Sequence, residues 1–392
     1  MAHTLISFLG KSQQNKTTGY RTANYDLDQQ LLTTAFLGVE LAKHLKPQKL
    51  LLIGTAGSMW DVFFEQHADN EHILNLIDAT ANNCVDEHLL KPCIPQIEQQ
   101  LGCEVECIVI QYARNEAEQV ALLSRIAQSL QENDRISIDV THSFRHLPML
   151  ALVASRFLQN VKNIQTEHIY YGALEMTENE RTPVIELDGL LKMLNWVDAL
   201  SVYNHDGSYQ VFADLFRQEQ ADLSAELLEK AAFYENTNQI HQARAPLTKF
   251  RKIENNASPL IQLFTEELKK RTAWAEQNDY ASRQLKMAEF YLQKRDYLRA
   301  GILAQEAWVS KMVQRYTASG EQSNYDNREM AQEHFKQVAS KNHREAFKML
   351  NLIRNALAHG TQAYDKGVQN ILSQPDGLLN KLKNIMQTIK NW

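Results

Sequence analysis

Short apolar runs alternate with amphipathic stretches over the first half of the chain. The apolar runs have the length of buried strands and occupy residues 4–9, 49–53, 104–110, 135–139, 166–172 and 183–187. The stretches between them carry apolar residues three and four apart, and they predict helices at 28–45, 115–130 and 149–158. Strands that alternate with helices predict an α/β fold with a Rossmann-like, mainly parallel sheet covered on both faces.

From about residue 203 the pattern becomes helical almost throughout. Apolar positions at helical spacing predict helices at 223–236, 259–277, 279–294, 296–315, 329–338, 341–360 and 364–390. The second half is therefore expected to be all-α. The change of period, together with the length of 392 residues, predicts an α/β domain over 1–202, a helical connecting region over 203–278 and an all-α domain over 279–392.

The helix expected at 341–360 gathers three polar side chains at its C-terminal end. Asn355 and His359 are four residues apart and share a face, and Arg354 lies on the flank of that face. A guanidinium binds phosphate through a planar fork, and an imidazole moves protons near neutral pH. RNA brings its own nucleophile, the 2′-hydroxyl, so this set suits RNA cleavage without a metal or cofactor. The plain alternative is that Arg354 and His359 cap the helix or face solvent.

Three loops follow strands of the expected sheet and are rich in Gly, Ser, Thr, His and Arg. Their candidate ligand-binding residues are Gly10, Lys11, Tyr20 and Arg21, then Gly54, Thr55, Ala56, Gly57, Ser58 and Met59, then Thr141, His142, Ser143, Phe144, Arg145 and His146. Ligands of open α/β sheets bind beyond the carboxyl ends of the strands. Backbone and hydroxyl donors, arginine and aromatic rings suit a nucleotide. Alternatively, Thr141 and Ser143 cap the next helix and Arg145 pairs with a carboxylate.

The charge of the chain is unevenly distributed. The net charge of −6 argues against a chain-wide affinity for nucleic acid. Residues 341–392, however, carry eight Lys and Arg against three Asp and Glu, a net of +5, which leaves −11 for the rest. A local phosphate-attracting surface around Arg354 and His359 is one interpretation, and a solvated basic face is the other.

Cysteine and hydropathy patterns predict a cytoplasmic protein without a metal. The four cysteines, Cys84, Cys93, Cys103 and Cys107, form no CxxC pair and are expected to be reduced thiols rather than zinc ligands. His142 and His146 have helical metal-ligand spacing but lack an acidic or cysteine partner at a suitable distance in the sequence. No leading apolar segment and no membrane-spanning run is seen.

Two sequence motifs carry a family resemblance. The segment LLLIGTAGS at 50–58, together with IDVTHSFRHLP at 138–148, resembles a CARF domain. The segment Arg354-Asn355-x-x-x-His359 in a helical half resembles a HEPN domain. The combination resembles the CARF–HEPN ribonucleases of type III CRISPR systems over nearly the whole chain, and it is weakest over 203–278.

The resemblance implies a ligand-gated enzyme of antiviral defence. A cyclic oligoadenylate, with the tetra-adenylate favoured, is expected to bind across a CARF homodimer and to activate the HEPN pair allosterically. Arg354, Asn355 and His359 of two subunits would then form one composite site that cuts single-stranded RNA and leaves a 2′,3′-cyclic phosphate and a 5′-hydroxyl. A homodimer or a higher oligomer of dimers is expected, with no membrane partner.

Two other functions stay open at this point. One is a non-catalytic ligand-sensing regulator whose helical half binds DNA or a protein. Residues 223–254 are its candidate helix-turn-helix, although the first part of this range is rich in acidic residues. The other is an additional activity in the CARF-like half that degrades the cyclic ligand, with Lys11, Ser12 and Thr55 positioning a ribose hydroxyl.

Overall fold

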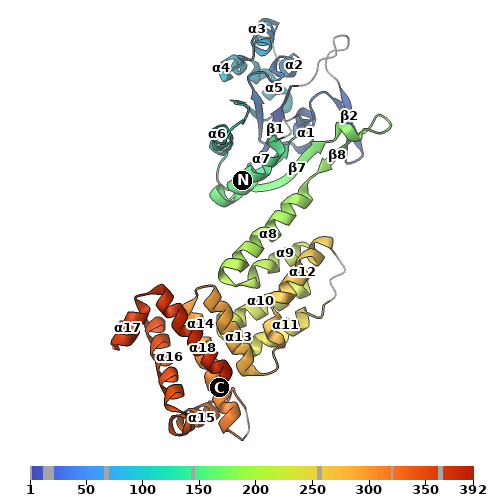
Figure 1. The fold of residues 1–392 in the computed structure, drawn as a ribbon. Helices are drawn as coiled ribbons and strands as arrows, with labels where there is room; N and C mark the ends of the chain where they lie inside the picture. The colour runs from blue at the N-terminus through green and yellow to red at the C-terminus, as the bar shows by residue number, and fades with distance from the viewer. Residues whose placement is uncertain are drawn as a thin grey trace. The chain divides into compact units, whose positions relative to one another are not determined.

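The computed structural model of the chain describes residues 2–11, 22–65, 70–142, 146–253, 258–318, 321–360 and 365–392. The chain divides into two compact units, Met1–Lys192 and Met193–Trp392. The first contains a mixed sheet with helices, and the second is helical (Figure 1). The predicted order of an α/β half followed by a helical half is confirmed.

The N-terminal unit is built on one eight-stranded sheet of order β3-β2-β8-β7-β6-β1-β4-β5. Its strands are β1 (His3–Leu9), β2 (Ala23–Leu27), β3 (Gln30–Thr34), β4 (Lys49–Thr55), β5 (Glu104–Ile110), β6 (Arg135–Asp139), β7 (Gln165–Gly172) and β8 (Thr182–Glu186). The pairs of β1 with β4 and β6, of β4 with β5, of β6 with β7 and of β2 with β8 are parallel. The pairs β2–β3 and β7–β8 are antiparallel. The sheet is therefore mainly parallel, as predicted.

Helices cover both faces of this sheet because its central strands are apolar on both sides. In β1, Leu5 and Leu9 point into one core and Ile6 and Phe8 into the other. The first core is closed by α1 (Leu37–Leu45), α2 (Trp60–Phe64), α3 (Asn70–Ala81), α4 (Glu87–Leu90) and α5 (Ile94–Leu101). The second is closed by α6 (Glu116–Gln128) and α7 (Leu147–Lys162) (Figure 1).

The helix predicted over 28–45 is wrong in its first part. Residues 23–34 form the β2–β3 hairpin, and α1 begins only at Leu37. Asp28 and Gln29 adopt left-handed φ values of 49° and 68°, which make the two-residue turn that joins antiparallel strands. Leu31 and Leu32 fit either period, so the apolar pattern alone did not separate hairpin from helix.

The helix predicted over 364–390 is interrupted. The structure has α17 (Lys366–Leu372) and α18 (Pro375–Asn391), separated by a short break. Pro375 occupies the first turn of α18, where its missing N–H costs nothing, and Gln374 before it is extended with φ −126°. The proline therefore starts a new helix and does not continue the preceding one.

The helical unit is organised around α14 (Tyr297–Tyr316), whose fully buried Trp308 contacts the rings of Phe335 and Phe347, which also contact each other. The other helices are α8 (Asp188–Asp206, which crosses the boundary between the units), α9 (Ala213–Gln218), α10 (Asp222–Asn236), α11 (Ile240–Phe250), α12 (Pro259–Arg271), α13 (Tyr280–Gln293), α15 (Tyr325–Val338), α16 (Lys341–His359), α17 and α18. Short 3-10 turns occupy Tyr209–Phe212 (η3) and Ala273–Glu276 (η4).

The predicted connecting region over 203–278 shares one hydrophobic core with the helices that follow it. Phe216, Leu228 and Phe250 belong to the same buried cluster as Trp308 and Leu350. The compact units accordingly divide after residue 192, and the predicted three-part division of the chain stays a prediction.

Candidate functional site

The first candidate site lies at the carboxyl ends of β1, β4 and β6, where the three predicted loops meet. The Gly10 carbonyl accepts a hydrogen bond from the Met59 N–H at 3.1 Å. A Cβ atom on Gly10 would lie 2.0 Å from the carbonyl oxygen of His142. Only glycine therefore allows the backbone after β1 to pass so close to the backbone after β6. The structure brings these three loops into contact, at the kind of crevice where α/β sheets bind ligands.

The hydroxyl groups in the loop after β4 interact within the loop itself. Thr55 and Ser58 are buried, the Ser58 hydroxyl accepts from the Thr55 N–H at 2.8 Å, and their hydroxyls lie 3.2 Å apart. The Trp60 indole N–H donates to the Thr55 carbonyl at 2.8 Å. Gly54 and Gly57 have no room for a Cβ, which would meet the ring of Trp60 and the Asn83 amide. The loop is thus rigid, and of its predicted residues Ala56 alone is half-exposed.

A buried polar network lies beneath these loops, and the sequence interpretation missed it. Asp139, at the end of β6, accepts from the Ser7 hydroxyl at 2.7 Å and from the Thr141 N–H at 3.0 Å. The Thr141 hydroxyl in turn accepts from the Gly172 N–H at 2.8 Å. The network joins the ends of β1, β6 and β7. Its signal in the sequence was a polar residue inside each of two apolar strands, since a buried polar group needs a partner.

His142 points inward and does not present its ring to solvent. Its Nε2 accepts from the Leu37 N–H at 3.4 Å, and its ring packs edge-on against Tyr25 and Phe36. Burial lowers the pKa of His142, which the charge of Asp139 offsets in part. The neutral ring therefore anchors the start of α1 to this loop.

The remaining predicted ligand residues divide into described and undescribed positions. His146 Nε2 lies 3.1 Å from the Tyr112 carbonyl, and Lys11 is exposed. The predicted residues Tyr20, Arg21, Ser143, Phe144 and Arg145 lie outside the described residues.

The second candidate site lies on α16, and its helix is confirmed with both predicted ends. Ser340 caps the start by accepting from the His343 N–H, and Gly360 ends the helix with φ 61°. Phe347, Leu350 and Ile353, which recur at helical spacing in the sequence, are buried. Leu357, the next residue at this spacing, is half-buried and packs against the same core.

Arg354, Asn355 and His359 keep one end of α16 polar. The Arg354 Nε donates to Gln305 Oε1 on α14 at 2.5 Å, which fixes the guanidinium against the neighbouring helix. Its two Nη groups have no hydrogen bond within the described part of the chain, so they stay free to bind an anion. Asn355 and His359 are exposed. The Arg354 guanidinium, which is held through its Nε, thus lies beside the exposed side chains of Asn355 and His359 at the same end of α16.

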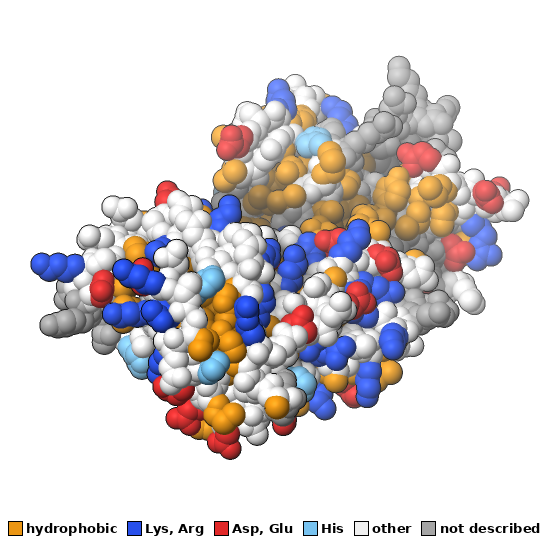
Figure 2. All heavy atoms as spheres, turned by 60° about the horizontal axis from the view of Figure 1, so that its bottom comes forward, with side chains coloured by type: hydrophobic (Ala, Val, Ile, Leu, Met, Phe, Trp, Pro, Cys, Tyr) orange, Lys and Arg blue, Asp and Glu red, His pale blue; other side chains and the backbone are white. Residues whose placement is uncertain are grey.

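The outward face of α16 is basic and polar along its length. Its exposed positions at helical spacing include Lys341, Glu345, Lys348, Asn355 and His359. Figure 2 brings the helical unit forward, and the face it shows carries many Lys and Arg side chains among scattered His and acidic groups. The exposed face of α16 suits a polyanion better than a small apolar ligand.

An apolar stripe runs along α7, the helix that follows the Thr141–His146 loop. Met149, Val153, Phe157 and Val161 are four residues apart, and their exposed fractions are 66%, 55%, 39% and 60%. Such a contiguous exposed apolar row typically marks an interaction surface. It begins within a few residues of the strand-end crevice.

Metal and membrane features are limited in the described residues. The cysteines at 84, 93, 103 and 107 are all free thiols. Within the described ranges, His168, Glu186 and Asp188 are the single group of side chains spaced for a metal ion, and His168 already bonds to Asp188 at 2.8 Å. Across the same ranges, every helix is too short or too polar to cross a bilayer.

Comparisons with known proteins agree with the N-terminal half of this picture. Residues 4–175 match the family described as the CARF domain of the CRISPR system endoribonuclease Csx1. The chain is also similar to the CRISPR-associated protein MJ1674 of Methanocaldococcus jannaschii, with 24% identity over 98% of this chain and 66% of that protein. The chain thus spans just under two thirds of the length of that relative. The matched family range ends before the helical unit begins.

Proposed function

We propose that this protein is a CRISPR-associated endoribonuclease that a cyclic oligoadenylate switches on. The observation that carries the proposal is the arrangement on α16, where a guanidinium with Nη groups unbonded among the described residues and an exposed imidazole share one helix end. That helix belongs to the same chain as a unit similar to the CARF domain of an endoribonuclease. The proposed HEPN-type site consists of Arg354, Asn355 and His359.

Cleavage in this proposal is transphosphorylation by the RNA itself. The 2′-oxygen attacks the adjacent phosphorus, the bond to the 5′-oxygen breaks, and the products are a 2′,3′-cyclic phosphate and a 5′-hydroxyl. His359 moves a proton at one of these oxygens, and Arg354 stabilises the charge that develops on the phosphoryl oxygens. Asn355, next to both on the helix surface, orients the ribose or phosphate. No step calls for a metal ion.

The activator is proposed to be a cyclic tetra-adenylate bound over the strand-end loops of two subunits. Glycines in the loops that meet at the ends of β1 and β4 let the backbone approach a ligand closely, although the N–H groups of Thr55, Ser58 and Met59 are bonded within these loops. A symmetric ring suits a two-fold homodimer, which presents the same loops twice. The ligand acts only through its preference for the active arrangement of the dimer.

The exposed stripe on α7 is the proposed contact between the two copies. It is apolar, it is self-complementary by symmetry, and it starts next to the loops that hold the ligand. A dimer formed through α7 therefore places both sets of loops near one axis. Two copies of the helical unit then supply the second Arg354 and His359 of a composite site.

Replacing Val153 with glutamate should convert the dimer to a monomer and abolish RNA cleavage. A carboxylate in the centre of this apolar row would be buried without a partner on dimerisation, which costs several kcal/mol. Sedimentation or light scattering measures the mass, and labelled RNA measures the activity. Gln159→Glu adds the same charge on the same helix outside the row and should stay dimeric. A dimeric, active Val153→Glu variant would place the interface elsewhere.

The two other functions have less support in the geometry. For a cyclic-ligand-degrading activity, Thr55 would have to reach a ribose, but its hydroxyl is buried against Ser58. For a DNA-binding regulator, α10 and α11 do form a helical hairpin with a short turn. Two cations of its second half are, however, engaged within the unit, since Arg244 donates to the Ala275 carbonyl and Arg251 pairs with Glu276.

Cleavage of single-stranded RNA in EDTA, measured with and without each cyclic oligoadenylate, tests the proposed function. Cutting that depends on one ring size supports it. A protein that binds a ring tightly but cuts no RNA would be a sensor without catalytic activity.

A further inference from the structure

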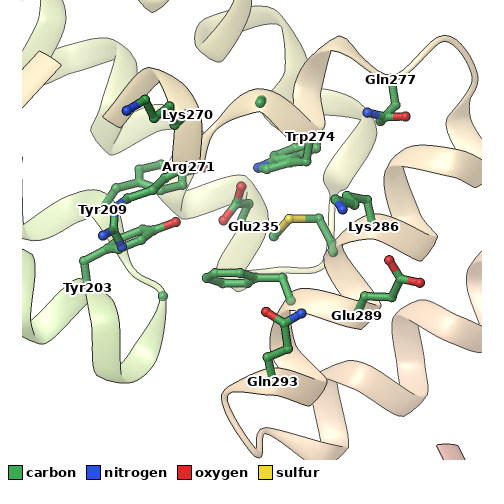
Figure 3. Close-up of a pocket in the computed structure, with 14 residues that line it drawn as sticks. Tyr203, Tyr209, Glu235, Lys270, Arg271, Trp274, Gln277, Lys286, Glu289 and Gln293 are labelled. Carbon is green, nitrogen blue, oxygen red and sulfur yellow. The ribbon is translucent and has the colours of Figure 1, made fainter. Parts of the chain in front are cut away.

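A pocket of about 270 Å³ opens in the helical unit, apart from α16 and its polar end. Its walls come from α8, η3, α10, α12, η4 and α13 and lie within the second unit. Figure 3 shows Glu235 at its centre, with Trp274 above it and Tyr203 and Tyr209 to one side. Neither the proposed RNA site nor the proposed activator site includes any of these residues.

The floor of the pocket holds two buried polar groups that lie beside each other. Glu235 is 3% exposed, and its Oε1 makes no hydrogen bond of ordinary length within the described part of the chain. The equally buried Tyr209 hydroxyl also lacks such a bond there, but it lies near enough to the Glu235 carboxyl to interact with it, as does Trp274. The Glu235 carboxyl is thus only weakly satisfied, and a ligand that bonded to it would recover free energy lost on burial.

The walls are aromatic and the rim is cationic. The aromatic side chains of Tyr203 and Trp274 line the cavity (Figure 3). Phe290 belongs to the same lining. The guanidinium of Arg271 lies 4.8 Å above the ring of Tyr203. Arg271 is held there by its ion pair with Glu267 at 2.8 Å.

Two lysines at the mouth remain to attract an anion. Lys286 is exposed and makes no hydrogen bond or ion pair within the described residues. The side chain of Lys270 is 77% exposed, and its Nζ is 4.0 Å from the Glu267 carboxylate, the outer limit of an ion pair. Glu289, the acidic group at the mouth, is paired with Lys390 at 2.5 Å. The entrance thus disfavours a cation, although aromatic walls around a carboxyl group would otherwise suit one.

We propose that this pocket binds a nucleotide, with its base stacked between the aromatic walls and bonded to Glu235, and its phosphate on the lysines of the rim. Stacking of a base needs flat aromatic walls of this kind. An amide or carboxyl group at the bottom of the pocket can form hydrogen bonds to the edge of the base. The source is either a free nucleoside monophosphate or one unpaired base of a longer RNA. The proposal does not rest on the proposed ribonuclease activity.

The charge state of Glu235 selects the base. Burial raises its pKa to about 8, and Tyr209, Arg299 and Trp274 offset part of that rise. At neutral pH the group is therefore mainly a neutral acid, with an O–H donor beside a C=O acceptor. Adenine presents the complement, a ring nitrogen acceptor beside an amino donor. The larger purine also covers more of the wall than cytosine does.

Calorimetric titration of the full chain with adenosine 5′-monophosphate tests the proposal. We expect saturable binding, and weaker binding of adenosine and of ribose 5-phosphate because each lacks one half of the contacts. Lys286→Met should lower the affinity for the nucleotide by about tenfold, because it removes a charged hydrogen bond to the phosphate. Lys230→Met removes an exposed lysine of α10 outside the pocket and should change nothing. A short adenylate RNA distinguishes the sources, since only an RNA ligand gains affinity with length.

The pH dependence gives a second readout that a merely structural Glu235 would not produce. Above pH 8 the acid ionises and loses its donor, so affinity for the nucleotide should fall on the order of tenfold between pH 7.5 and 9.5. The tyrosines that face it, Tyr203, Tyr209 and Tyr291, have raised pKa values because they are buried, so none of these tyrosines titrates in this window. Glu235→Gln keeps a donor beside an acceptor and should bind without this pH dependence.

Three results would overturn the proposal. One is tight binding of spermine with none of the nucleotide, which would make the pocket a cation cage. The second is nucleotide binding that Lys286→Met and Glu235→Gln leave unchanged in both strength and pH dependence. The third is no binding of any of these compounds by the folded protein. RNA cleavage is not measured in any arm, so failure here is separate from failure of the proposed function.

Discussion

The His359→Ala variant should lose RNA cleavage by about 10²- to 10⁴-fold, the usual contribution of a proton-transferring side chain. His359 is exposed in the last turn of α16, and no contact of the described residues depends on its ring. Alanine is also the best helix former, so the helix should persist. Rates under single-turnover conditions with saturating activator measure the effect on the chemical step.

A matched control separates the loss of the His359 imidazole from a general effect of substitution on α16. Asn342→Ala changes another exposed polar residue of α16, in its first turn, and should leave cleavage unchanged. His359→Ala should bind the cyclic activator as tightly as the wild type, because the ligand loops lie in the other unit. Full activity of His359→Ala in a folded, dimeric protein would remove His359 from the proposed mechanism.

The Gly10→Ala variant should bind the cyclic activator at least about tenfold more weakly and lose most of the RNA cleavage that the activator switches on. Its new Cβ would lie 2.0 Å from the His142 carbonyl oxygen, a backbone atom that cannot rotate away. The chain must shift at the end of β1 or β6, which breaks the bond from the Met59 N–H and costs on the order of 1–3 kcal/mol. The crevice between these strands is where the ligand is proposed to sit.

The control for this variant is Gly189→Ala, in the first turn of α8. A Cβ there meets nothing within 4 Å, so stability and activator binding should be unchanged or slightly improved. Thermal unfolding reports the stability of both variants, and calorimetry with the cyclic ligand reports binding. Unimpaired activator binding by Gly10→Ala would show that the ligand does not depend on the junction of these loops.

Strong periodicity made part of this structure predictable. The apolar spacing of Phe347, Leu350 and Ile353, with Gly360 after it, indicated α16 and its C-terminal end. The hairpin at 23–34 was missed because two leucines fit both periods and the deciding signal was the left-handed turn at Asp28 and Gln29. Local pattern identifies elements, and it fails where a turn without glycine decides the topology.

The chemistry of the sites was harder to read from the sequence. The side chain of His142 looked available for a ligand, yet it packs inward and accepts a bond from Leu37, more than one hundred residues away in the chain. The same holds for Thr55, whose hydroxyl turns back to Ser58. Glu235 carried no signal at all, because its burial depends on helices that are distant in sequence. Residue type and spacing predict which groups are present, and tertiary packing decides which of them remain free.

The most direct test of the ribonuclease proposal is cleavage of a labelled single-stranded RNA in EDTA, with cyclic tri-, tetra- and hexa-adenylate added separately. We expect cutting only when one ring, the tetra-adenylate, is present, with products that end in a 2′,3′-cyclic phosphate and a 5′-hydroxyl. Cutting that is equal with and without every ring, or that EDTA abolishes, would contradict a ligand-gated, metal-independent ribonuclease.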